Sequence, residues 1–115
     1  MRIVSKDNCI KHYQWGTGCD GWVLADTKEL SVKQERMPAQ TAEQLHYHRF
    51  AQQFFFILTG TASFEVEEEK FTVEAGQGFY IGPGKKHRIL NETASDIEFI
   101  LSSQPSTNND RINCI

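Results

Sequence analysis

Hydrophobic and polar residues alternate along most of this chain with a period of two, which is the period of a β-strand and not of a helix. The clearest example is residues 61–67, in which Phe64 and Val66 fall on one side and Ser63 and Glu65 on the other. Other short segments of strand character are separated by Gly, Pro or charged turns and cover residues 22–25, 30–37, 46–50, 53–58, 71–73, 79–81, 88–90 and 97–101. The pattern predicts an all-β sandwich or barrel with little helix.

Residues 53–58 depart from this alternation, because the run from Phe54 to Leu58 is apolar on both faces. One face of such a strand can line the interior, and the other needs cover from a second layer. The N-terminal segment or a second subunit would supply that layer, so a homodimer is expected. The charged residues 67–70 predict a hairpin tip, and the turn-forming residues after Gln104 predict an irregular tail over about 104–115.

The composition narrows the class of protein. The chain has 115 residues, of which 39% are hydrophobic and 23% charged, as in a single globular domain spanning 1–115. The net charge is −3 and the basic residues are scattered, so nucleic acid is not an expected partner. No stretch approaches the roughly 18 apolar residues of a membrane helix, and residues 1–7 lack the apolar region that a secretory signal would have, so neither is expected. Three cysteines without a C-x-x-C pair favour a reducing compartment, and a cytoplasmic location is expected.

Three of the four histidines, with one glutamine, have a spacing that suits a metal ion. His46 and His48 are two residues apart, Gln53 follows five residues later, and His87 ends a Gly-rich turn. Residues i and i+2 of a strand project to the same side, so the first two imidazoles point together. Neutral imidazole is the commonest protein ligand for transition metals. The sequence therefore predicts a site for one divalent metal, with Zn, Ni, Fe or Mn all compatible with these ligands.

Two motifs make the chain resemble the cupin family. The first, Gly-x5-His-x-His-x4-Glu-x6-Gly, is matched at His46, His48 and Gly60, with Gln40 and Gln53 in place of its Gly and its Glu. The second, Gly-x5-Pro-x-Gly-x-x-His-x3-Asn, is matched at Gly76, Gly84, His87 and Asn91, with Gly82 in place of its Pro. The resemblance covers a core of about 30–101. It implies a small antiparallel jelly-roll barrel with one metal held by His46, His48, Gln53 and His87.

Gln53 is the departure from the family pattern with the clearest chemical meaning. A neutral amide in place of a carboxylate leaves a divalent ion with a ligand-shell charge of +2. Such an ion binds less tightly, is a stronger Lewis acid, attracts carboxylates or enediolates, and disfavours O₂ chemistry through a trivalent state. Small cupins that act on unsaturated uronic acids carry Gln here, and this chain is similar to them in size. Alternatively, Gln53 does not ligate and orients a water or His48.

The function predicted from these features is a metal-dependent isomerase or lyase acting on a small anionic sugar acid or keto acid. A metal-dependent dioxygenase with the same ligands is one alternative. A non-catalytic module that binds a small molecule or a metal is another, because one fold hosts many chemistries. No carboxylate is identified as a general base, so the catalytic residues stay unknown at this stage.

Two polar residues of the segment 30–37 are candidate substrate contacts. Gln34 and Arg36 share a strand face with Leu30 and Val32, so the apolar parity predicts that they point into the barrel. There Arg36 would bind an anionic substrate. The alternative is a surface ion pair with a neighbouring glutamate.

Aromatic and C-terminal residues complete the set of candidates. Tyr80 either hydrogen-bonds substrate, or acts as an acid, or packs as a structural aromatic. Phe55 and Phe99 are expected to shape the pocket. Asp110 and Arg111 either fold over the mouth of the barrel or pair with each other.

Overall fold

The structure is a computed structural model that describes all 115 residues. It contains one short 3₁₀ turn, η1 (Lys6–Asn8), and no α-helix. The strands are β1 (Lys11–Trp15), β2 (Cys19–Asp26), β3 (Ser31–Met37), β4 (Thr41–Ala42), β5 (His46–Tyr47), β6 (Gln52–Thr59), β7 (Thr61–Val66), β8 (Glu69–Glu74), β9 (Gly78–Ile81), β10 (His87–Asn91), β11 (Ile97–Gln104) and β12 (Ile112–Asn113). No helix has the length and apolar character needed to span a membrane.

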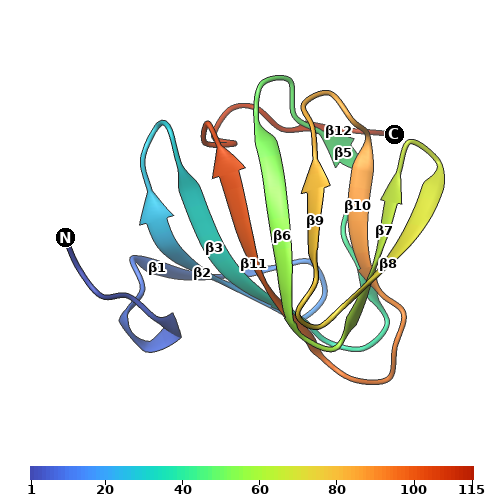
Figure 1. Cartoon of the computed structure of the whole chain (residues 1–115), viewed down its shortest axis with the longest axis horizontal. Helices are drawn as coiled ribbons and strands as arrows, with labels where there is room; N and C mark the ends of the chain where they lie inside the picture. The colour runs from blue at the N-terminus through green and yellow to red at the C-terminus, as the bar shows by residue number, and fades with distance from the viewer.

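The strands form two antiparallel sheets that face each other (Figure 1). One sheet has the order β1-β2-β3-β11-β6-β9, and the other has the order β12-β5-β10-β7-β8, with β4 also paired to β10. Neighbours in each sheet are mostly distant in sequence, as in a jelly roll, where the chain crosses repeatedly between sheets. The predicted all-β antiparallel jelly-roll fold is confirmed.

The hairpin between β7 and β8 turns at the predicted charged tip. Glu67 and Glu68 both adopt positive φ values, of 49° and 71°. Two successive left-handed residues are the geometry of a type I′ turn, whose twist matches that of the flanking strands. The turn keeps Phe64 opposite Phe71 on the same pair of strands.

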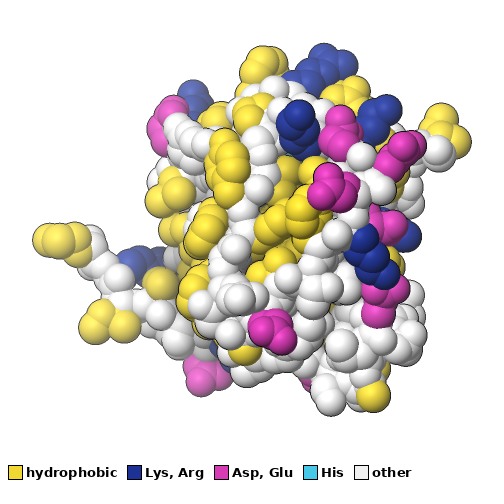
Figure 2. Space-filling view, turned by 45° about the vertical axis from the view of Figure 1, so that its right-hand side comes forward, with side chains coloured by type: hydrophobic (Ala, Val, Ile, Leu, Met, Phe, Trp, Pro, Cys, Tyr) yellow, Lys and Arg dark blue, Asp and Glu magenta, His cyan; other side chains and the backbone are white.

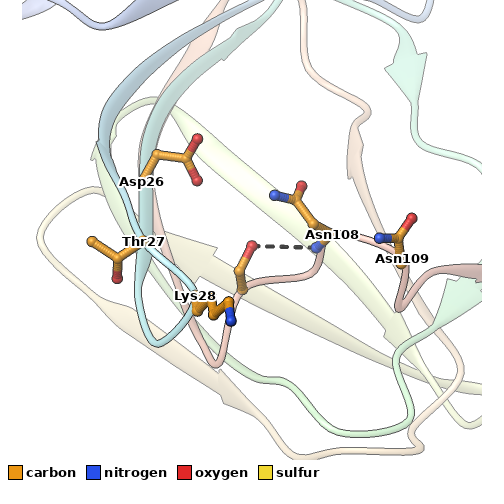
Figure 3. A pocket seen from close by; sticks show the side chains of 6 residues that line it. Asp26, Thr27, Lys28, Asn108 and Asn109 are labelled. Atoms are coloured by element: carbon orange, nitrogen blue, oxygen red, sulfur yellow. Dashed lines mark hydrogen bonds between the residues drawn. The ribbon is translucent and has the colours of Figure 1, made fainter.

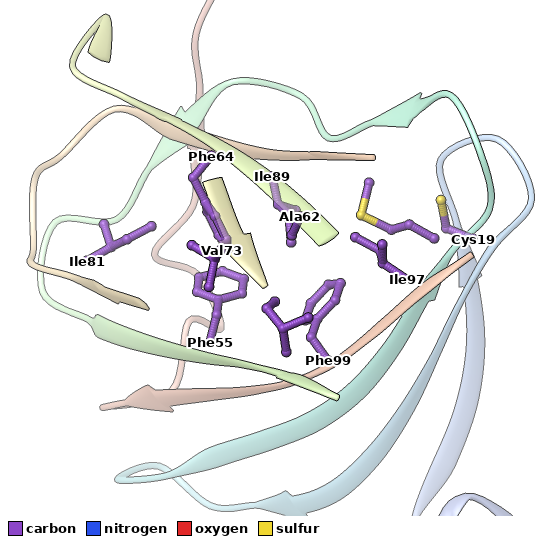
Figure 4. Packing of buried hydrophobic residues seen from close by; sticks show 11 residues of the cluster. Cys19, Phe55, Ala62, Phe64, Val73, Ile81, Ile89, Ile97 and Phe99 are labelled. Atoms are coloured by element: carbon purple, nitrogen blue, oxygen red, sulfur yellow. The ribbon is translucent and has the colours of Figure 1, made fainter. Parts of the chain in front are cut away.

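The hydrophobic core fills the space between the two sheets (Figure 4). It consists of Cys19, Met37, Phe55, Ile57, Ala62, Phe64, Val73, Ile81, Ile89, Ile97 and Phe99. The ring of Phe55 lies 4.9 Å from that of Phe64 and 5.7 Å from that of Phe99, in tilted or edge contacts that favour aromatic packing. Phe55 and Phe99 are thus core residues with almost no exposed surface.

The strand β6 alternates more strictly than its sequence suggested. Gln53, Phe55 and Ile57 point into the barrel and are buried. The outer side chains stay partly in solvent, with Phe54 at 45%, Phe56 at 39% and Leu58 at 40% exposure. The N-terminal segment does not cover them, because its first residues stand away from the body of the molecule (Figures 1 and 2) and Lys6 docks instead on Glu98 of β11 and Trp22 of β2. The expected second layer is therefore absent within one chain.

The strand β3 has the opposite orientation to the one its apolar residues predicted. Ser31, Glu35 and Met37 point inward, and Gln34 and Arg36 lie on the outer face. The expectation that Gln34 and Arg36 face the barrel interior is wrong. It failed because the interior at this strand carries a buried carboxylate, Glu35, so apolar parity was a misleading guide.

On that outer face the two residues have structural partners. Arg36 donates to the carboxylate of Asp20 at 2.7 Å and to that of Asp96 at 3.0 Å. Gln34 donates to Glu98 at 3.3 Å. Both side chains are occupied by surface hydrogen bonds and ion pairs, away from the histidine cluster.

The C-terminal tail folds back onto the barrel. After β11, residues 106–109 turn beside the β2–β3 connection, where Asp26, Thr27 and Lys28 help to line a polar hollow of about 390 Å³ (Figure 3). The backbone N–H of Ser106 donates to the carbonyl of Lys28 at 2.9 Å. The chain then pairs as β12 with β5 over two residues, and apart from this short strand residues 105–115 form turns and loops, as expected for an irregular tail.

Candidate metal centre

Two paired strands, β5 and β10, bring the histidines to one place inside the barrel. His46 begins β5, His48 follows it, and His87 begins β10, directly opposite His46 in the ladder. The turn before β10 reaches back to the same site. Gly84, at a positive φ of 78°, donates its N–H to the carbonyl of His48 at 2.7 Å. A left-handed residue at this turn favours glycine.

The three imidazoles are buried and converge. Their possible ligand atoms all lie within 4.8 Å of one another. Ring centroids are 4.9 Å apart for His46 and His48, and 4.4 Å apart for His46 and His87. The exposed fraction of each residue is 4% or less.

Hydrogen bonds at Nδ1 decide which nitrogen of each ring is free. Nδ1 of His46 lies 2.7 Å from the carbonyl of Gln44, Nδ1 of His48 lies 2.8 Å from that of Asp110, and Nδ1 of His87 lies 2.7 Å from that of Lys85. A carbonyl only accepts, so a neutral ring must carry its proton on Nδ1 to bond there. Each Nε2 then presents a lone pair, which is the form of imidazole that ligates a metal.

The fourth side chain adds an oxygen to the same point. Gln53 donates through Nε2 to the hydroxyl of Ser103 at 3.0 Å, which turns its Oε1 toward His87. Oε1 lies 3.1 Å from Nε2 of His87, so two acceptors face each other. The Nε2 of His48 is buried without any hydrogen-bond partner. Buried polar atoms are normally satisfied, so this donor set fits a divalent transition metal.

Burial also keeps the rings neutral. It lowers the pKa of His46 to about 3 and that of His87 to about 4, and it lowers the pKa of His48. The positive charge of Arg111 acts in the same direction on all three. Desolvation penalises the charged form of imidazole, so the rings stay neutral, and able to ligate, at pH values far below the usual pKa of histidine.

This burial predicts an unusual pH dependence of metal binding. Protons compete with metal only below the ligand pKa, which is about 6.5 for an ordinary histidine. We expect the affinity of the chain for Zn²⁺, measured by competition titration, to change little between pH 7 and about 5 and to fall steeply as the pH approaches 4. A steady loss of affinity beginning near pH 6.5 would contradict it.

Other predicted site residues lie apart from this cluster or act through it. Tyr80 is 58% exposed on the outer side of β9, where its hydroxyl donates to Gln52 at 2.9 Å. Asp110 and Arg111 do fold back onto the barrel and do not pair with each other. Asp110 holds the loop after His48, and Arg111 lies 3.4 Å from Glu43.

A buried carboxylate on the inner face of β3 was not identified from the sequence. Glu35 is 8% exposed, and burial raises its pKa. It accepts a hydrogen bond from the hydroxyl of Tyr13 on β1. The tyrosine ring reaches it across β2 because Gly21 has no side chain there, and a Cβ atom on that glycine would lie 2.0 Å from the ring. The only sequence signal is the glycine in a strand, which often marks a close approach.

Glu35 lines a cavity that reaches the histidine cluster only through Glu43 and Gln44, which lie beside Nδ1 of His46. The cavity has a volume of about 330 Å³ and lies between β1 and β3 on one side and the segment 42–44 on the other. Lys33, Glu43 and Arg111 also line it. Glu43 approaches Nδ1 of His46 at 3.9 Å, and burial raises its pKa to about 7. The site thus combines a neutral donor cluster with a neighbouring cavity that holds two carboxylates and two cations.

The fold and the donor cluster together define a cupin-type barrel. A sequence model of the cupin domain matches residues 33–103, and the chain belongs to the cupin family. The recognition made from the two motifs is confirmed.

The chain spans only part of the length of the curated relatives that it matches. An uncharacterized protein of Methanocaldococcus jannaschii, MJ1618, is 28% identical over 75 residues, which are 65% of this chain and 60% of that protein. The HTH-type transcriptional regulator YdeC of Bacillus subtilis is 39% identical over 56 residues, which are 49% of this chain and 19% of that protein.

Solved structures support the fold. A sugar phosphate isomerase of the cupin superfamily from Silicibacter pomeroyi superposes with a TM-score of 0.71 and 17% identity, covering 77% of this chain and 60% of that one. A predicted oxalate decarboxylase from Thermotoga maritima gives a TM-score of 0.80 and 19% identity, covering 91% of this chain and all of that one. At these identities the likeness concerns the fold alone.

Proposed function

We propose that the protein is a metal-dependent enzyme of the isomerase or lyase type that acts on a small anionic sugar acid or keto acid. One observation carries the proposal. Four neutral donors converge in a buried site, and the Nε2 of His48 has no partner within the protein. His46, His48, Gln53 and His87 would hold the metal. Because none of them is an anion, the full divalent charge would remain available to a negatively charged substrate.

The residues around the site favour the same class of substrate. When bound, a divalent metal supplies a Lewis acid that polarises a carbonyl oxygen. Lys33 and Arg111 line the adjacent cavity and add positive charge beside it. Arg111 is close enough to lower the pKa of all three histidines, so it contributes to a field that attracts anions.

Glu35 is the group that we assign to proton transfer. An isomerase must remove a proton from one carbon and return it to another, and a buried carboxylate with a raised pKa suits both steps. Tyr13 donates to one oxygen of Glu35, and no other protein group hydrogen-bonds to the carboxylate. The second oxygen is therefore available to a bound ligand in the 330 Å³ cavity.

The test is turnover of an unsaturated uronate by metal-loaded protein, followed by the loss of ultraviolet absorbance. We expect turnover with the wild type, and none with the metal-stripped wild type. The Glu35→Gln variant should keep its metal and lose at least about 100-fold in kcat, the usual scale for a general acid or base. Substrate-dependent O₂ uptake in place of uronate turnover would support the dioxygenase alternative instead.

A binding module is the second candidate, and the match to YdeC favours it. That protein is named as a transcriptional regulator, and the matched region is one part of it. A domain of this kind would bind a small anion without catalysing any reaction of it. Saturable binding of uronates without any turnover, with each of the four candidate metals, would support this reading over the enzyme.

We further propose that a second copy of the chain covers the outer face of β6. Phe54, Phe56 and Leu58 form an apolar row there, on a face of the molecule where hydrophobic side chains gather (Figure 2). Exposed apolar rows of this kind mark interfaces. Light scattering should give a dimer for the wild type and a monomer for Phe56→Glu, and the control Thr72→Glu on β8 should remain a dimer.

A further inference from the structure

The last residues of the chain form a strap that closes on the histidine cluster. We call residues 110–114 the C-terminal strap. Within it, β12 pairs with β5, placing Asn113 opposite His46. The backbone N–H of Cys114 donates to the carbonyl of Leu45 at 2.8 Å, and Gln44 donates back to the carbonyl of Cys114 at 2.7 Å. The strap is therefore bound along the whole of the strand that carries the first histidine.

Asp110 is the centre of this contact. Its Oδ1 accepts the N–H of Arg49 at 2.7 Å, and its Oδ2 accepts those of Phe50 at 3.1 Å and Ala51 at 3.0 Å. These three amides are the loop that leads from His48 to Gln53. One buried carboxylate thus sets the path of the chain between two of the four metal-site residues.

The same residue also sets the orientation of His48. The carbonyl oxygen of Asp110 accepts from Nδ1 of His48 at 2.8 Å, which directs the unpartnered Nε2 into the cluster. The next residue, Arg111, is linked to His46 through a glutamate. Arg111 lies 3.4 Å from Glu43, and Glu43 lies 3.9 Å from Nδ1 of His46. Groups that bond the outer nitrogen of a ligating histidine fix its tautomer and its angle.

We propose that Asp110 is a positioning residue of the metal site, and that docking of the C-terminal strap and binding of the metal are thermodynamically coupled. This inference rests on the proposed metal site. If the docked strap strengthens metal binding, then bound metal must strengthen docking by the same factor. The far end of the chain would thereby control a site whose ligands end at residue 87.

The variant Asp110→Asn tests the positioning role. Asparagine has nearly the same volume as aspartate, but its side-chain NH₂ would face backbone N–H groups. A donor would then oppose donors, and the loop after His48 would lose hydrogen bonds that hold it. We expect Co²⁺ to bind about 10- to 100-fold more weakly than in the wild type, the usual scale for such outer groups. The visible absorption of bound Co²⁺ should also change in shape, because the angle of His48 changes.

Two controls separate positioning from general loss of stability. Ile97→Val leaves a small void in the part of the core that contains Cys19, far along β11 from Ser103 and Gln53, and it should leave Co²⁺ affinity unchanged. Asp96→Asn removes a surface carboxylate paired with Arg36 and should behave likewise. If Asp110→Asn binds Co²⁺ with the affinity and spectrum of the wild type, the positioning role is overturned. If the wild type itself binds no Co²⁺, the metal site and this coupling both fail.

Hydrogen exchange tests the reverse direction of the coupling. Saturating Co²⁺ should slow exchange at the amides of Arg49, Phe50, Ala51 and Cys114, and should leave that of Gly76, which bonds to Ile57 elsewhere, unchanged. Equal exchange at these four amides with and without bound metal would overturn the coupling while leaving the metal site intact.

Discussion

Purified without chelator, the wild-type protein is expected to carry about one transition-metal ion per chain, and the His48→Ala variant close to none. The reason is the orphaned Nε2 of His48, which no protein group satisfies. Structural zinc sites contribute about 10–16 kcal/mol, so one of four donors is worth about 3 kcal/mol or roughly 100-fold in affinity. Native mass spectrometry of the intact protein measures the number of bound metal ions per chain directly.

The fourth histidine provides a matched control. His12 is on β1, where its ring stacks on Trp22 at 5.2 Å and bonds to Asp20 at 3.2 Å, outside the cluster. His12→Ala should retain the wild-type metal content. Thermal unfolding adds a second measurement, because metal at 100 times its Kd should stabilise the wild type by about 2.7 kcal/mol and the His48→Ala variant by almost nothing. Equal metal content in all three proteins would remove the basis for the metal centre.

The second large effect is expected from Gln53→Glu, which restores the carboxylate of the usual cupin pattern. A unit negative charge about 4 Å from a divalent ion adds about 8 kcal/mol of attraction at an effective dielectric of 20, and the cost of burying the carboxylate offsets most of it. We therefore expect metal to bind about 10- to 100-fold more tightly. Ser103 can adapt, because its hydroxyl accepts from the amide of Gln53 in the wild type and can donate to a carboxylate.

The same substitution should weaken catalysis. An anionic ligand reduces the charge that the site presents to an anionic substrate, so turnover of a uronate should fall as affinity for metal rises. The two measurements are competition titration and kcat on one preparation. Ser103→Ala is a suitable companion, since it leaves the charge unchanged and removes the hydrogen bond that orients Gln53. Unchanged metal affinity in Gln53→Glu would indicate that this side chain is not a ligand.

Most of the candidate site could be predicted because its signals are local. His46 and His48 point to the same side because residues two positions apart in a strand share a face. Gln53 and His87 followed from their place in two short motifs. The structure brings all four side chains together.

The residues around the metal site could not be predicted in this way. Glu35 was overlooked because the parity of β3 was judged from Leu30 and Val32, whose side chains are not the buried ones. The tyrosine that hydrogen-bonds to Glu35 lies on another strand, and its reach depends on the empty position at Gly21. Such contacts join residues far apart in sequence and have no local pattern.

By itself, then, the sequence determined most of the strands, though not β1, β4 or β12, and the candidate ligand set, since strand alternation, turn residues and motif spacing all act over a few positions. Only the tertiary structure decided which polar residues are buried, where the outer face of β6 is left open, and how the last residues hold His48. Those features depend on the pairing of distant strands. Pairing is decided by the total burial and hydrogen bonding of the whole barrel, and no single segment carries that information.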